Sequence, residues 1–117
     1  MNASAIITGA VFVLVLDGFA HSSAGVTSCR VVQSLAQEHA QDMARRERLD
    51  HAGFAKRAAR GARAENVAMG YSSKLKTLAQ WQASPRHAAN MRLPGCKGLA
   101  HAVSRNGTYY WVLIIGR

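Results

Sequence analysis

The chain has 117 residues, of which 49% are hydrophobic, and carries 15 Lys and Arg against 6 Asp and Glu for a formal net charge of +9. This length corresponds to about one domain, and the apolar fraction argues against an intrinsically disordered chain. The two cysteines form no CxxC unit, which argues against thiol redox catalysis or a cysteine metal cluster. The charge favours acidic partners such as nucleic acid, anionic lipid or anionic envelope polymers, but a basic solvated surface is the simpler explanation.

The N-terminus contains a short apolar run at residues 5–16. It is too short to span a bilayer comfortably, and it fits the hydrophobic region of a signal peptide. Small residues at 22–25 fit a cleavage site, although no Lys or Arg precedes Arg30. We therefore expect a signal peptide at 1–24 and one domain at 25–117. A buried N-terminal helix or strand, a membrane anchor and a mis-assigned start codon are the alternatives.

The first half of the expected domain begins with a helix. Between residues 28 and 48, apolar positions recur at intervals of three and four, which predicts an amphipathic helix. Residues 52–64 are rich in Gly, Ala and Arg with little periodicity, and we expect an irregular basic loop containing at most a helical turn. Residues 65–71 then form a short extended segment.

The second half predicts two helices and a hairpin. Ser72 or Ser73 caps a helix that ends near residue 82, and Pro85 starts a further short helix through Met91. The strand-like runs at 99–104 and 109–115 flank an Asn-Gly pair, a strong hairpin signal. The second run is apolar throughout, which predicts a central strand covered on both faces. The order of elements predicts an α+β fold with helices around a small antiparallel sheet.

Four short blocks follow one another in fixed order: LDHAGF at 49–54, AENVAMGY at 64–71, WQASPRHAANM at 81–91 and YYWV at 109–112. Their order and spacing resemble the CAP (SCP/PR-1-like) domain family, in its bacterial, YkwD-like branch, over residues 31–116. The resemblance implies an α-β-α sandwich, here shortened at its N-terminus. The activities of this family are diverse, so the resemblance selects no ligand.

The resemblance also implies a cleft lined by His51, Glu65 and His87. Ser84 stands where many members carry a second acidic residue, so a tight metal site is not expected. We expect no required cofactor and at most weak binding of a divalent cation such as zinc by His51 and His87. A buried polar network that fixes loops onto the sheet needs the same geometry and is an equal alternative. The residues expected to line the ligand-binding cleft are His51, Glu65, Asn66, Ser84, His87 and Asn90.

Ser84 is the one serine whose sequence context makes it a candidate nucleophile. Ser84 lies three residues before His87 around a helix start, and with Glu65 the pair could form a hydrolytic set. A serine before Pro85 is also the ordinary N-cap pattern, which is the simpler explanation. The basic residues between 45 and 63 form the strongest charge run and could contact phosphates or anionic lipid heads. They lack interleaved aromatics, and a solvated loop is the simpler explanation here too.

Cys29 and Cys96 are the only cysteines of the chain, and export would permit their oxidation, so we predict a disulfide between them. The leading functional hypothesis is a secreted or periplasmic, non-enzymatic binding module for a lipid, another small ligand or an anionic envelope polymer. A hydrolase is the first alternative, metal-assisted or using His51, Glu65 and His87 as acid and base. A basic nucleic-acid-binding protein is the second.

Overall fold

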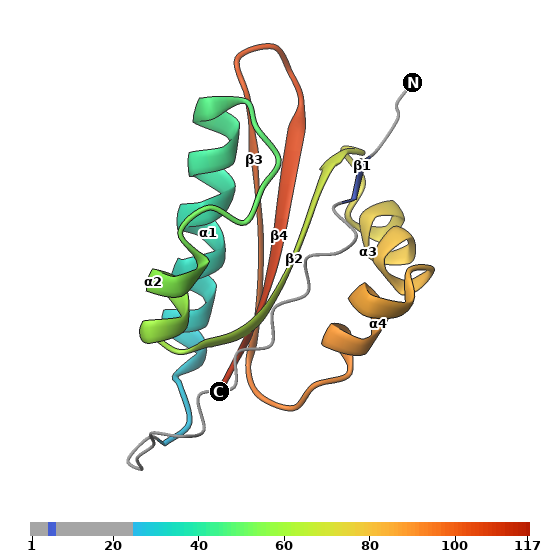
Figure 1. Ribbon diagram of the computed structural model, residues 1–117. Helices are drawn as coiled ribbons and strands as arrows, with labels where there is room; N and C mark the ends of the chain where they lie inside the picture. The colour runs from blue at the N-terminus through green and yellow to red at the C-terminus, as the bar shows by residue number, and fades with distance from the viewer. Residues whose placement is uncertain (1–4, 7–24) are drawn as a thin grey trace.

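The computed structural model describes residues 5–6 and 25–117, so the predicted signal peptide lies outside the described residues except for one two-residue strand. Helices flank both faces of an antiparallel sheet, with α1 and α2 on one side and α3 and α4 on the other (Figure 1). This α+β arrangement confirms the predicted fold class. The helices and strands are β1 (Ala5–Ile6), α1 (Cys29–Arg46), α2 (Phe54–Ala59), β2 (Ala62–Gly70), α3 (Lys74–Gln82), α4 (Pro85–Met91), β3 (Lys97–Val103) and β4 (Tyr109–Gly116).

Helix α1 supplies most of one layer. The side chain of Ser28 caps its N-terminus by accepting a hydrogen bond from the Val31 N–H, and Glu47 ends it in the left-handed conformation with φ 56°. Its apolar stripe packs against β3 and β4, which makes this the largest helix–sheet contact in the described chain. Within residues 5–6 and 25–117, no helix is long and apolar enough to cross a bilayer.

The described strands form one sheet in the order β1, β2, β4, β3, with every pair antiparallel. Strand β4 is therefore central, and its side chains alternate between the two layers. Tyr110, Val112 and Ile114 join the core beneath α1. Trp111, Leu113 and Ile115 join a second core on the opposite face. The prediction of a central strand covered on both faces is confirmed.

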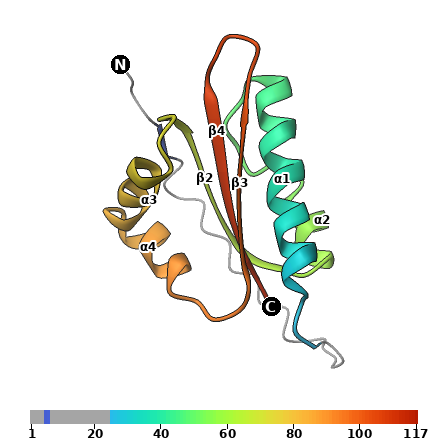
Figure 2. The same ribbon diagram turned by 180° about the vertical axis from the view of Figure 1, so that it is seen from behind.

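The second layer consists of α3 and α4, which pack on each other and lie over β2, as the view from behind shows (Figure 2). The Ser73 hydroxyl caps α3 by accepting from the Lys76 N–H. Trp81 is fully buried beneath this layer, and its indole N–H donates to the Val67 carbonyl at 3.2 Å. The layer is thus anchored to the strand that carries the candidate site residues.

Residues 52–64 are more regular than the sequence predicted. They contain α2 and the first part of β2, which begins at Ala62 and not near Glu65. Gly53, with φ 80°, precedes α2, and Phe54 and Ala58 are buried against the core. Burial of these two side chains stabilises a short helix that lacks a clear sequence periodicity.

The predicted disulfide is confirmed: Cys29 and Cys96 are bonded, with their Cα atoms 5.1 Å apart. It joins the start of α1 to the entry of β3. Gly98 permits this close approach, because a Cβ there would lie 2.6 Å from the Val32 carbonyl oxygen. Beside it, the Gln33 amide donates to the Leu99 carbonyl at 2.8 Å and accepts from the Leu99 N–H at 3.0 Å.

Candidate functional site

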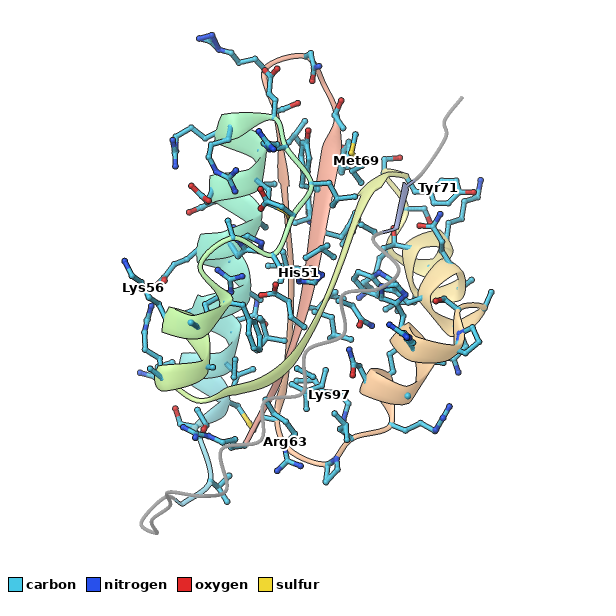
Figure 3. All side chains as sticks on the ribbon, in the orientation of Figure 1. His51, Lys56, Arg63, Met69, Tyr71 and Lys97 are labelled. Atoms are coloured by element: carbon cyan, nitrogen blue, oxygen red, sulfur yellow. A yellow bond between two sulfur atoms is a disulfide. The ribbon has the colours of Figure 1, made fainter. Side chains whose placement is uncertain are left out.

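Strand β2 divides the candidate residues between the two layers. Successive side chains of a strand point to opposite faces. Glu65 faces α2 and the loop after α1, while Asn66 faces α4. Figure 3 shows His51 reaching from that loop toward β2. The site therefore consists of two clusters that share the peptide between Glu65 and Asn66.

The first cluster is centred on the carboxylate of Glu65, which is fully buried. Arg57 donates to both carboxylate oxygens, from Nε to Oε2 at 2.6 Å and from Nη2 to Oε1 at 3.0 Å. The Nδ1–H of His51 donates to Oε1 at 2.7 Å. Arg57 is itself 8% exposed and also donates to the Ala52 carbonyl at 2.8 Å. A buried anion is thus paired with one guanidinium and one imidazole.

These contacts set the protonation of Glu65. Burial raises the pKa of the Glu65 carboxyl, but the hydrogen bonds from His51 and Arg57 together outweigh burial and hold the pKa below its ordinary value. The group is therefore an anion at neutral pH. A carboxyl that serves as general acid near neutrality needs the opposite shift, so this environment does not suit Glu65 to that role.

His39 is a third imidazole beside this cluster, on the buried face of α1. Its Nε2 lies 2.8 Å from the Asp50 carbonyl and 3.9 Å from Glu65 Oε1. Since a carbonyl only accepts, Nε2 carries the proton. Burial lowers the pKa of His39 and outweighs the nearby Glu65 charge, which raises it. His39 is therefore neutral at pH 7, and its buried Nδ1 has no hydrogen-bond partner among the described residues.

The second cluster lies on the α4 side. Asn66 donates from Nδ2 to the His87 carbonyl at 3.1 Å, and Asn90 donates to Asn66 Oδ1 at 2.9 Å. The Ser84 hydroxyl lies 2.8 Å from Nδ1 of His87, whose side chain is fully buried. Ser84 is the N-cap residue of α4 and Pro85 follows it as the first helical residue, as expected, but the serine side chain makes no capping hydrogen bond. Its hydroxyl contacts the histidine instead.

The sequence-predicted residues thus fall into two groups. His51 meets Glu65, while Ser84, His87, Asn66 and Asn90 form the second cluster. Asn90 Nδ2 also lies 3.5 Å from the Glu65 carbonyl, which links the groups through the backbone of β2. These contacts hold His51 in the first cluster and His87 in the second, and none of them joins the two imidazoles directly. That all six predicted residues line one cleft therefore stays a prediction.

Sequence reasoning missed Arg57 and His39 as site residues. Arg57 stood in a basic run with no spacing that distinguished it from its solvated neighbours. The signal for it is indirect, because a buried carboxylate requires a cationic partner. His39 had a clearer signal, since it lies on the apolar stripe of α1, three or four residues from Leu35, Ala36 and Met43. A histidine in such a stripe is expected to be buried.

The donor set does not fit a divalent cation at Glu65. Both carboxylate oxygens already accept from Arg57, whose fixed positive charge would repel a metal ion. Within the described part of the chain, no three His, Cys, Asp or Glu side chains are arranged to hold a metal. Weak zinc binding by His51 and His87 therefore stays a prediction, without a third ligand from Glu65 to support it.

The basic run between residues 45 and 63 is largely neutralised by acidic partners. Arg46 donates to Asp42 and Asp50, and holds the pKa of the Asp50 carboxyl at about 2. Arg45 also pairs with Asp42. Arg60 donates to Glu38 at 2.7 Å on the surface. Because Arg57 is also ion-paired, with Glu65, most of the charge of this run is compensated by acidic side chains.

Comparison with known proteins gives a single finding. The CAP family, described as the cysteine-rich secretory protein family, matches residues 25–115. No curated protein and no solved structure matches the chain. The matched range contains α1 through most of β4, and therefore both clusters and the disulfide. Because this range is most of the chain and agrees with the fold, the protein belongs to the CAP family.

Proposed function

We propose that the protein is an exported, non-enzymatic binding module of the bacterial branch of the CAP family, with its ligand site beside the cluster of His51, Glu65 and Arg57. The observation that carries the proposal is the pairing of Glu65 with Arg57 and His51. The pairing neutralises the one carboxylate of the cleft and holds the His51 ring in a fixed orientation. An imidazole held in one orientation, beside a carboxylate that is already ion-paired, suits ligand recognition better than proton transfer.

A small ligand group is supported by the space beside this cluster. A cavity of about 240 Å³ lies between α1 and α2. Its lining includes His39, Arg57 and Ala52, the residue after His51. Charged side chains of both signs complete it: Lys56, Arg60, Glu38 and Asp42. The volume is below the usual range for ligand pockets, which suits a head group and not a whole lipid. Because cationic and acidic side chains both line the cavity, we infer a lipid head group or another small zwitterionic ligand.

Export is supported by the disulfide between Cys29 and Cys96. Disulfides persist in oxidising compartments and are rare in the cytosol. The family description, cysteine-rich secretory protein, agrees with this compartment. We therefore propose that the domain works outside the cytoplasm, secreted or in the periplasm.

Hydrolysis is the second candidate function, and the contact between Ser84 and His87 favours it. Two features weigh against it. The hydroxyl meets Nδ1 of His87, the nitrogen that usually faces the orienting carboxylate in a triad. Glu65 is paired with Arg57 and His51 in the other cluster. Turnover of an ester or amide that is lost in Ser84→Ala and His87→Ala, but not in His101→Ala, would establish hydrolysis in place of binding.

Native mass spectrometry of the full chain purified from an exporting host tests the binding proposal. We expect a co-purified small molecule on the wild-type protein. His51→Ala should lose it and remain folded, whereas His101→Ala, an exposed histidine on β3, should retain it. Retention of the molecule by His51→Ala, or a wild-type protein purified without any ligand, would contradict the proposal.

A further inference from the structure

The two helical layers differ sharply in charge. Residues 66–117 contain seven Lys and Arg but no Asp or Glu. Every acidic residue of the described chain lies on α1, in the loop after it, or on the first half of β2. On the α1 side, Arg46, Arg57 and Arg60 are paired with these acids. Positive charge is therefore least compensated on the α3 and α4 side.

The cations of this side are exposed on neighbouring elements. Helices α3 and α4 form the outer layer on one face of the sheet (Figure 2), and β3 begins beside them. Figure 3 places Tyr71 by the α3 layer and Lys56 on the opposite side of the molecule. The exposed cations along this layer are Lys74, Lys76, Arg86, Arg92 and Lys97.

An apolar side chain stands among these charges. Leu75 is 75% exposed, the highest value for a large hydrophobic residue on either helical layer. It lies between Lys74 and Lys76 in the first turn of α3, and Lys76 Nζ lies 5.7 Å from the centre of the Tyr71 ring. Basic residues around an exposed leucine, with a half-buried tyrosine beside them, are the composition of surfaces that bind membranes from one side.

We propose that the outer surface of α3 and α4 docks onto bilayers that contain anionic phospholipid. The five cations contact the lipid phosphates, and Leu75 enters the boundary between head groups and acyl chains. An anionic polymer would offer the same charge to the cations, but it would offer no apolar region in which Leu75 could be buried. This docking surface is separate from the His51 cluster, which faces α1 and α2, so it goes beyond the proposed ligand site.

Vesicle co-sedimentation tests the proposal with the full chain. Vesicles of phosphatidylcholine alone serve as the reference for mixed phosphatidylcholine and phosphatidylglycerol, so that any contribution of the apolar N-terminus cancels. Each basic residue near an anionic surface contributes roughly fivefold in affinity. The double variant Lys74→Glu/Lys76→Glu should therefore weaken binding to anionic vesicles by at least about 25-fold. Both positions accept Glu without loss of the helix, because acids are favourable in a first turn.

Arg30→Glu/Arg48→Glu is the matched control, since it makes the same change in net charge at two exposed positions on the α1 side, away from the proposed ligand cavity. If the position of the cations and not the net charge determines vesicle binding, this control should keep its affinity for anionic vesicles within about twofold of wild type. Leu75→Ser should weaken binding at high salt, where charge is screened, while Val26→Ser, at a residue 79% exposed before α1, should not. Equal losses in the two double variants would overturn the proposal. So would equal binding to a soluble polyanion with no effect of Leu75→Ser, which indicates an anionic polymer as partner.

Discussion

The ion pair of Arg57 with Glu65 is expected to dominate the stability of the site. Arg57→Met keeps the length of the side chain but removes four hydrogen bonds, two to Glu65 and one each to the carbonyls of Ala52 and His51. Glu65 is then left in a fully buried position with His51 as its remaining side-chain hydrogen-bond partner. Removing one member of a buried pair destabilises proteins by about 3–5 kcal/mol, because the other charge loses its compensation. We expect a loss in this range, which is a large part of the stability of a small domain.

Urea denaturation at pH 7, followed by tryptophan fluorescence, measures this loss. Arg60→Met is the matched control, since Arg60 follows α2 directly and pairs with Glu38 at the surface. It should leave the midpoint close to wild type, because exposed pairs contribute little. Arg57→Met/Glu65→Gln should recover part of the loss, because it also removes the buried charge. If Arg57→Met were no more destabilising than Arg60→Met, the assignment of Arg57 as the essential partner of Glu65 would be wrong.

Three further outcomes follow from the structure. The pKa of His39 is lower in the folded than in the unfolded chain, so the unfolded chain takes up the proton first as the pH falls. The free energy of unfolding should therefore be full above about pH 6.5 and decrease as the pH drops toward the folded-state pKa. Urea melts at a series of pH values should show this dependence in the wild type and not in His39→Gln. Reducing the Cys29–Cys96 disulfide, which spans 67 residues of sequence, should lower the free energy of unfolding by about 4 kcal/mol, and an unchanged midpoint after reduction would count against the bond. Zinc calorimetry should show no binding tighter than micromolar, since Glu65 supplies no third ligand; sub-micromolar binding that survives His51→Ala and His87→Ala would show that other residues hold the metal.

The sequence was sufficient for the fold because its strongest signals are local. Helical spacing in α1, the serine at the start of α3, and the Asn-Gly turn before β4 each specify one element without knowledge of the rest. Helix α2 lacked such a signal. Its order comes from burial of Phe54 and Ala58, a tertiary contact that no local pattern encodes.

The sequence identified most residues of the site, but it did not predict that they form two separate clusters. The resemblance identified His51, Glu65 and His87, and the contact of His51 with Glu65 is present. The alternation of β2 places Glu65 and Asn66 on opposite faces, which depends on where the strand begins and how it is paired. Arg57 could not be distinguished from the other cations, because its role depends on one long-range partner.

The decisive measurement is the pKa of Glu65, since the proposed function depends on a carboxylate held as an anion by Arg57 and His51. Carbon-13 NMR of the Glu side-chain carboxyls, assigned with Glu65→Gln and titrated in the full chain, gives this value. We expect a midpoint below the ordinary Glu value of about 4.3, and an upward shift of that midpoint in Arg57→Met. A wild-type midpoint at or above the ordinary value would contradict this expectation and would return Glu65 to the role of a catalytic acid.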